Sequence, residues 1–287
     1  MVPGNPLTDR SSLAAGTRNL LNALSAWQRD VSVLTWDGTQ GFLPIIRRSM
    51  LRRQLDSLAV ALELVESNRG YAAVSLLRPA CEELLWLRYF NTLPSADATS
   101  LAECLIGSRL LMDLEAQAGE VGENEMTVMG LDRALAGFRS KEPALRQRLK
   151  ELGGRLDWPS RAVSAGDVPS TWFVAKATDS TKMYRFLYHA TSRYVHFSAV
   201  ELARRGWGHP GRLEISADTY EPVWAAFSLS WGTRLFGWTL QAALDALRAE
   251  GVAEPPHDAL QQAFDMITEV ALVPLVTPDE MVWSADS

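Results

Sequence analysis

The sequence predicts an all-α fold in the form of a multi-helix bundle, and three observations favour it. First, apolar residues recur at helical spacing along most of the chain. The clearest run, at steps of four, three, four and three, is Leu51, Leu55, Leu58, Leu62 and Val65. Second, only residues 31–36 and 213–216 alternate as strands do, and neither stretch has a convincing partner. Third, 47% hydrophobic and 22% charged residues are typical of a globular chain that buries a core.

Capping and breaking residues set the expected ends of the helices. We expect Gly70 to end one helix and Pro79 to kink the next, because proline lacks a backbone donor and clashes with the preceding turn. A helix interruption is expected near Pro143, and a loop over residues 158–170. The expected helices cover residues 11–33, 45–67, 71–91, 95 or 97 to 117, 125–152, 179–205, 219–250 and 258–270.

No boundary in the sequence is strong enough to divide the chain, so we expect residues 1–287 to form one helical domain. Within it, residues 45–250 are the expected helical core, residues 1–44 an N-terminal extension, and residues 251–287 a C-terminal helix and tail. Two cysteines favour a reducing compartment, and the first residues lack the pattern of a secretory signal. No apolar run reaches the length of a membrane helix, so a cytoplasmic protein is predicted.

The net charge of −6 hides an uneven distribution of charge. Residues 213–287 hold twelve acidic side chains against two basic ones, whereas residues 176–212 hold seven basic side chains against two acidic ones. A basic stretch of this kind is typical of a solvated helix face. It is also typical of a surface that attracts a polyanion, and under this second interpretation the expected partner is RNA or a nucleotide.

Aromatic residues concentrate between residues 172 and 238, and three tryptophans recur there every seven residues. Trp224, Trp231 and Trp238 therefore return to nearly the same face of one helix. Such a stripe indicates a bulky core or a dimer seam. The alternative is a stacking platform for a base or nucleotide, with Trp231 and the neighbouring Arg234 as its ligand-binding residues.

Residues 184–198 are a polar and aromatic segment that carries the candidate chemistry. In a continuous helix, residues four apart share a stripe. The first stripe is Tyr184, Tyr188, Ser192 and His196. The second stripe, rotated by about 100°, is Arg185, His189 and Arg193. Polar groups at this density need partners wherever the fold buries them.

An upstream helix offers those partners, because Arg78 and Glu82 lie one turn apart on it. An Arg–Glu–His–Tyr cluster supplies a tunable acid or base and a phosphate clamp. The alternative is a structural hydrogen-bond network between two core helices. The candidate catalytic residues are His196, Arg193, Arg78, Glu82, Tyr188 and Ser192, and the candidate ligand-binding residues are Arg185, His189, Trp231 and Arg234.

The pattern YxxxSxxxH at residues 188–196, together with RxxxE at residues 78–82, resembles an uncharacterised bacterial family of helical proteins. That family is distantly similar to HEPN domains. The resemblance implies a HEPN-like helical core with N- and C-terminal extensions, and a homodimer. It also implies a metal-independent ribonuclease in a toxin–antitoxin or phage-defence setting, with an antitoxin or another protein as partner. The chain departs from the HEPN signature of an arginine, four to six residues and a histidine, because two residues separate Arg193 from His196 and three separate Arg185 from His189.

Under this resemblance, His196 is the expected general acid or base on an RNA 2′-hydroxyl or leaving oxygen. Arg78 or Arg193 is expected to stabilise the phosphate charge, and Glu82 to orient the imidazole. The alternative functions are a non-enzymatic helical sensor or interaction module that binds a small ligand or a protein, and an enzyme that acts on a small molecule.

Other chemistry has little support in the sequence. Four histidines without an HExxH pattern, and two cysteines without CxxC spacing, predict no metal and no cofactor. The letters GxGxxG at residues 206–211 follow a predicted helix, so we expect an interhelical turn there. A nucleophilic pair of Cys81 and His196 is conceivable, but cysteine on an apolar helix is more typical of a small buried side chain.

Overall fold

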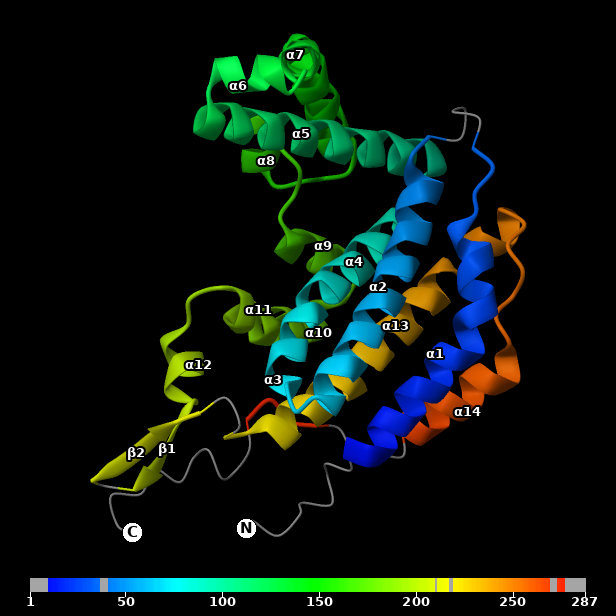
Figure 1. The fold of residues 1–287 in the computed structure, drawn as a ribbon. Helices are drawn as coiled ribbons and strands as arrows, with labels where there is room; N and C mark the ends of the chain where they lie inside the picture. Colours follow the sequence, from blue (N-terminus) through cyan, green and yellow to red (C-terminus); the bar gives the residue numbers. More distant parts are fainter. Residues whose placement is uncertain (1–9, 37–40, 210, 217–218, 269–272, 277–287) are drawn as a thin grey trace. The chain divides into compact units, whose positions relative to one another are not determined.

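The computed structural model describes residues 10–36, 41–209, 211–216, 219–268 and 273–276. In these residues the fold is an all-α arrangement of helices with one small hairpin, which confirms the predicted class (Figure 1). The ends of the expected N-terminal extension and C-terminal tail, residues 1–9 and 277–287, lie outside the described residues. None of the helices in the described part has the length and apolar character that a membrane crossing requires.

The helices differ widely in length. The longer ones are α1 (Arg10–Ser32), α2 (Leu43–Glu66), α4 (Leu77–Thr92), α5 (Ser95–Val121), α7 (Asp132–Arg155), α13 (Glu221–Ala249) and α14 (His257–Thr268). The shorter ones are α3 (Gly70–Ala73), α6 (Glu123–Val128), α8 (Ser160–Ala165), α9 (Thr171–Ala177), α10 (Thr181–Met183), α11 (His189–Val195) and α12 (Ala199–Ala203). A 3₁₀ turn (Val74–Leu76), a π-helical turn (Tyr184–Tyr188) and strands β1 (Gly206–His209) and β2 (Arg212–Ile215) complete the described elements.

The chain divides into two compact units. The first consists of Met1–Thr35, Arg47–Arg88 and Ser180–Ser287, and the second of Trp36–Ile46 and Tyr89–Asp179. All residues proposed above for catalysis or ligand binding belong to the first unit. The division into an extension, a core and a tail within one domain stays a prediction.

The core of the first unit is a cluster of apolar side chains from α1, α2, α4, α13 and α14. The buried members are Leu20, Leu24, Trp27, Val31, Leu51, Leu55, Leu58, Leu87, Phe236, Leu240, Ala243, Leu247 and Leu260. The five residues whose spacing predicted a helix face on α2 are all buried, as an apolar stripe facing a core should be. In the second unit, α5, α6 and α7 bury Leu111, Met126 and Leu135 against one another.

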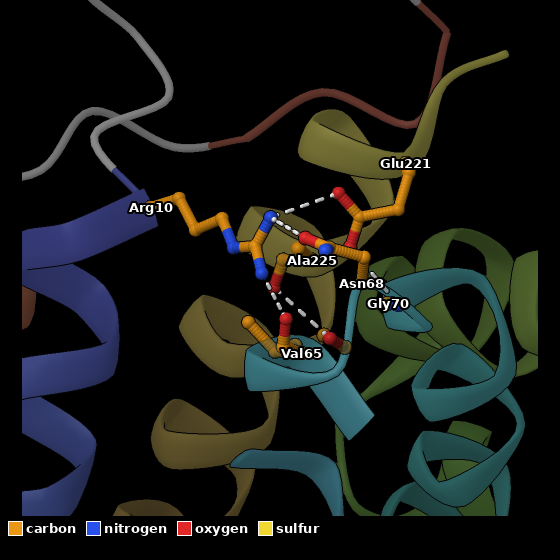
Figure 2. Close-up of polar contacts among 7 residues, drawn as sticks. Arg10, Val65, Asn68, Gly70, Glu221 and Ala225 are labelled. Carbon is orange, nitrogen blue, oxygen red and sulfur yellow. Dashed lines mark hydrogen bonds and ion pairs between the residues drawn. The ribbon is translucent and has the colours of Figure 1, made fainter. Parts of the chain in front are cut away.

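A polar junction in the first unit joins the end of α2 to the start of α13 (Figure 2). Arg10, the first residue of α1, donates to the Val65 carbonyl, to Asn68 Oδ1 at 2.8 Å and to Glu221 Oε2 at 3.1 Å. The other oxygen of Glu221 accepts from the Gly70 backbone N–H at 3.1 Å. An arginine at the C-terminal end of one helix and a carboxylate in the first turn of another both complement the helix dipoles. These hydrogen bonds therefore link the start of α1, the end of α2, the start of α3 and the start of α13.

Gly70 packs against the backbone of α13 at this junction. A Cβ atom built on Gly70 would lie 2.5 Å from Ala225 Cα and 2.6 Å from Ala225 N. The approach of α3 to α13 therefore requires a residue without a side chain. The sequence predicted Gly70 only as the end of a helix, and the structure instead places it at the start of α3.

Two breaks in the helices fall where the sequence did not place them. The expected kink at Pro79 is wrong in position, because the helix breaks at Val74–Leu76 and Pro79 is the third residue of α4. Proline is tolerated in a first helical turn, where its missing N–H has no partner to lose. Likewise Pro143 interrupts nothing and lies inside α7, while Gly130, with φ of +68°, separates α6 from α7. The expected loop at residues 158–170 contains the short helix α8.

The prediction of one helix over residues 179–205 is wrong. The segment contains α10, the π-helical turn and α11, and then leaves the helix at His196, whose φ and ψ are −115° and 161°. Ser198 starts α12 by accepting a hydrogen bond from the Glu201 backbone N–H with its side chain. Serine is a preferred N-cap, so this residue favours a new helix over continuation of the old one.

Strands β1 and β2 pair antiparallel. Gly206 pairs with Ile215, and the register continues to His209 and Arg212. The expectation that residues 213–216 have no strand partner is therefore wrong, and so is the interhelical turn expected at residues 206–211, of which residue 210 lies outside the described residues. The first strand was not predicted because it contains Gly206 and Gly208, and glycine has low strand propensity.

Candidate functional site

Three of the predicted residues meet on the first unit, where α4 lies beside the π-helical turn and α11. Arg78, from α4, places one terminal nitrogen 2.5 Å from His196 Nε2 and the other 2.8 Å from the hydroxyl oxygen of Tyr188. Its guanidinium carbon lies 4.7 Å from the centroid of the Tyr188 ring. The predicted association of the two chain segments is therefore present, with Arg78 at its centre.

The contact with Arg78 gives the imidazole a fixed neighbour. An arginine side chain has only donors, so His196 Nε2 is the acceptor in this arrangement. The His196 ring is also exposed to solvent. An exposed imidazole beside a cation is a group that an anionic ligand can reach.

The π-helical turn positions Tyr188. It widens the helix over Tyr184–Tyr188 and stacks the Tyr184 and Tyr188 rings with centroids 4.6 Å apart and planes inclined by 15°. At the end of such a turn, backbone carbonyls lose regular helical partners. Thr191 Oγ1 donates to the Leu187 carbonyl at 2.6 Å, and Ser192 Oγ donates to the Tyr188 carbonyl at 2.5 Å. Single π-helical turns inside helices occur frequently at functional sites.

Ser192 links Tyr188 to His196, and Glu82 lies near the stacked tyrosines. The Ser192 hydroxyl is committed to the Tyr188 carbonyl, and the Ser192 carbonyl accepts from the His196 backbone N–H at 3.0 Å. Ser192 is thus hydrogen-bonded to both Tyr188 and His196. Burial raises the pKa of the Tyr184 hydroxyl, and the charges of Tyr188 and Glu82 act in the same direction. Glu82 therefore lies within electrostatic reach of the stacked tyrosines.

The second predicted stripe lies at the surface. Arg185, His189 and Arg193 are exposed, and the His189 ring stands edge-on to Tyr184 with centroids 4.9 Å apart. Arg185 and Arg193 add positive charge close along the chain to the Arg78 cluster. They suit contacts with neighbouring anionic groups, as the basic composition of this segment predicts.

The segment after His196 is held by a buried ion pair. Glu201 and Arg204 of α12 pair at 3.0 Å, with side chains that are 4% and 11% exposed. Arg204 also donates to the Leu275 carbonyl at 2.7 Å and lies over the Trp224 ring, 4.3 Å from its centroid. Aromatic and hydrogen-bonding partners of this kind offset part of the cost of burying the two charges. The sequence did not predict this pair, although its i,i+3 spacing is a signal for it.

Of the aromatic stripe of α13, Trp224 is buried, whereas Trp231 and Trp238 are half-buried. Trp224 and Phe227 are buried, and Trp231 Nε1 donates to the Val273 carbonyl at 3.1 Å. Arg234 lies with its guanidinium carbon 5.9 Å from the Trp231 centroid, and burial lowers its pKa. These contacts favour the interpretation of the stripe as core.

Among the described residues, no group of three His, Cys, Asp or Glu side chains is placed to hold an ion. The conceivable nucleophile Cys81 is fully buried, and burial raises the pKa of its thiol to about 12. A thiol in that state is neither ionised nor reachable at neutral pH.

We expect both cysteines of the folded protein to resist a thiol reagent such as DTNB at pH 8. Burial raises the pKa of both thiols, and both side chains are inaccessible. Labelling should be at least about 100-fold slower than in guanidinium-unfolded protein, because the thiolate is the reacting species. Stopped-flow absorbance measures both rates, and rapid labelling of the native protein would contradict the burial of Cys81.

Comparison with known proteins gives one match. Residues 45–211 match a family described as a family of unknown function, DUF5677. The matched range covers more than half of the chain and includes Arg78, Tyr188, Ser192 and His196, whereas Trp231 and Arg234 follow it. No curated protein and no solved structure matches the chain. The resemblance to an uncharacterised helical family is confirmed at this level, and the chain belongs to the family of unknown function DUF5677.

Proposed function

We propose that the cluster of Arg78, Tyr188 and His196 binds a phosphodiester of RNA and cleaves it without a metal. The observation that carries the proposal is the convergence of Arg78 on both Tyr188 and His196. A guanidinium is the side chain best suited to a phosphate, because its planar donors match two phosphate oxygens. It contacts an imidazole and a phenol, which can serve as the base and the acid in the cleavage of a phosphodiester.

In the proposed reaction, a phosphate oxygen replaces His196 as an acceptor of the Arg78 donors. His196 Nε2 then takes the proton of the ribose 2′-hydroxyl, and the 2′-oxygen forms a bond to phosphorus. The bond from phosphorus to the 5′-oxygen breaks, and the Tyr188 hydroxyl donates a proton to this leaving oxygen. The products are a 2′,3′-cyclic phosphate and a 5′-hydroxyl end, and water returns the proton from His196 to Tyr188. Arg78 stabilises the charge that develops on the phosphorane.

Surrounding groups extend this site. Arg185 and Arg193 are exposed on the same segment and suit the phosphates on either side of the cleaved one. Glu82 orients the cluster through its charge. The HEPN-like core and the cytoplasmic toxin–antitoxin or phage-defence setting, with an antitoxin as partner, are part of the proposal. The spacing of Arg193 and His196 differs from the HEPN signature, and the proposal assigns the phosphate to Arg78 instead.

The test is cleavage of a dye-labelled single-stranded RNA by the purified full chain in the presence of EDTA. We expect products with cyclic phosphate ends, and no cleavage of the DNA oligonucleotide of the same sequence, which lacks the 2′-hydroxyl. His196→Ala should lower the cleavage rate about 100-fold or more, in the range expected for a general base. Arg78→Ala should weaken RNA binding measured by fluorescence anisotropy.

His257→Ala is the matched control, because His257 is also exposed but lies at the start of α14. It should cleave at the wild-type rate. Circular dichroism must show that each variant is folded. The proposal fails if the folded wild-type chain cleaves no RNA, or if His196→Ala cleaves as fast as the wild type.

A second candidate is a non-enzymatic interaction module. The observation that favours it is a set of exposed apolar side chains in residues 195–215, around and after His196. Its members are Val195, Phe197, Val200, Leu202, Leu213 and Ile215. Exposed apolar groups gathered in this way mark interaction sites. A folded chain that self-associates or binds a protein but cleaves no RNA would favour this candidate.

A further inference from the structure

Strand β2 is an edge strand that no other strand of the described residues covers. All four of its residues are exposed, including Leu213 at 60% and Ile215 at 83%. Its partner in the described residues is β1, which gives a sheet of two strands. Two strands alone are marginally stable in water, and an exposed apolar edge invites pairing with another strand.

The register of the hairpin shows which backbone groups face the open edge. Ser216 N donates to the Arg205 carbonyl at 2.9 Å, one pair beyond Gly206 and Ile215. In an antiparallel ladder, hydrogen-bonded pairs alternate with non-hydrogen-bonded pairs. The residues of β2 that bond to β1 are therefore 212 and 214, and the N–H and C=O groups of Leu213 and Ile215 point away from β1.

We propose that β2 pairs antiparallel with β2 of a second copy of this chain, about a two-fold axis at Leu213. The two hairpins then form one four-stranded sheet. Leu213 lies opposite Leu213 of the second copy and exchanges two backbone hydrogen bonds with it. A two-fold interface needs a surface that complements itself, and β2 meets this condition.

Charge selects this register. The outward groups of residues 213 and 215 permit self-pairing centred on residue 212, 213 or 214. Centring on Arg212 or Glu214 puts a charge opposite the same charge, which is destabilising. Centring on Leu213 puts Arg212 opposite Glu214 of the second copy, and by symmetry Glu214 opposite Arg212. Only this register gives two favourable pairs.

The apolar face of the sheet adds to the interface. Side chains alternate across a strand, so Leu213 and Ile215 share the face opposite to Arg212 and Glu214. Pairing brings the two Leu213 side chains together on that face. The interface is distinct from the Arg78 cluster and does not depend on the proposed RNA cleavage.

Charge reversal tests the pairing. Arg212→Glu and Glu214→Arg each place like charges opposite one another, whereas the double variant restores two opposite-charge pairs. We expect sedimentation velocity to show a wild-type dimer, with a dissociation constant raised about tenfold or more in each single variant and restored in the double variant. A monomeric wild type at about 100 µM, or a dimer that neither single variant weakens, overturns the proposal. If the wild type is a monomer, the exposed edge of β2 would instead suit pairing with a strand of a different protein.

Disulfide trapping tests the register independently. In the proposed dimer, Leu213→Cys lies opposite its own copy and should form an intermolecular disulfide under mild oxidation, because directly opposed Cβ atoms are close. Ile215→Cys is the matched control, since it lies opposite Gly211 and its two copies are far apart along the strands. The native Cys81 and Cys104 are buried and do not compete. Equal cross-linking of the two variants on a non-reducing gel would overturn the register.

Discussion

Replacing Glu221 with alanine will lower the free energy of unfolding by about 3 kcal/mol. The Glu221 side chain is 7% exposed and pairs with Arg10, which is 29% exposed. Removing one partner of a buried pair leaves an uncompensated charge, which costs about 3–5 kcal/mol. The partial exposure of Arg10 places the loss at the lower end of this range. The Gly70 N–H also loses its acceptor in the variant.

Arg18→Ala is the control for the loss of an ion pair. Arg18 also lies on α1 and pairs with Glu66, but both side chains are about half exposed. Exposed pairs contribute about 0–1 kcal/mol, so this variant should unfold close to the wild-type midpoint. Urea denaturation followed by circular dichroism measures both. If the two variants lose equal free energy of unfolding, the hydrogen bonds around Arg10 do not stabilise the fold more than an exposed ion pair does.

Replacing Gly70 with alanine will destabilise the protein by about 3 kcal/mol, at the upper end of the range for overpacking. The new methyl group would lie 2.5 Å from Ala225 Cα. Because the obstructing atoms belong to the backbone of α13, no side-chain rotation can relieve the clash. The helices must separate, and both Glu221 contacts at the junction then weaken.

Gly137→Ala should instead stabilise the protein. Gly137 lies inside α7, and a Cβ atom there would meet nothing within 4 Å. Alanine is favoured over glycine inside a helix by about 0.5–1 kcal/mol, so the melting temperature should rise. Differential scanning calorimetry of the two variants separates a general effect of added methyl groups from the contact at Ala225. A Gly70→Ala variant as stable as the wild type would show that α3 and α13 can move apart at little cost.

The long helices were predictable because each carries a repeating apolar pattern. The stripe from Leu51 to Val65 on α2 is an example. Its five apolar residues follow helical spacing, which predicts one buried helix face, and all five are buried. The breaks were harder to predict. Pro79 lies in the first turn of α4, where proline is tolerated, and the sequence does not show where that turn begins. Pro143 lies inside α7, and the sequence alone did not show that the helix continues through it.

The candidate site was predictable in composition but not in geometry. The spacing of Tyr188, Ser192 and His196 and the upstream Arg78 indicated which residues gather. It placed them on a continuous helix, whereas a π-helical turn precedes His189 and the chain is extended at His196. A π-helical turn has no strong local signal, and hydroxyls four residues after the affected carbonyls, as at Ser192, are the clue that was present. The Arg10 junction joins residues more than 200 positions apart, and no local pattern could indicate it.

The π-helical turn also makes the orientation of Tyr188 depend on chain length as well as on residue identity. An α-helix advances by about 100° per residue, so a segment with one residue more or fewer points its later side chains in a different direction. Loss of Phe186 or Leu187 would place Tyr188 three residues after Tyr184 instead of four, and so change how the two stacked rings face each other. A chain could therefore keep every side chain named for the site and still lose it through a one-codon deletion. Related sequences should accordingly be compared for the spacing between Tyr184 and His196 before they are compared for the residues themselves.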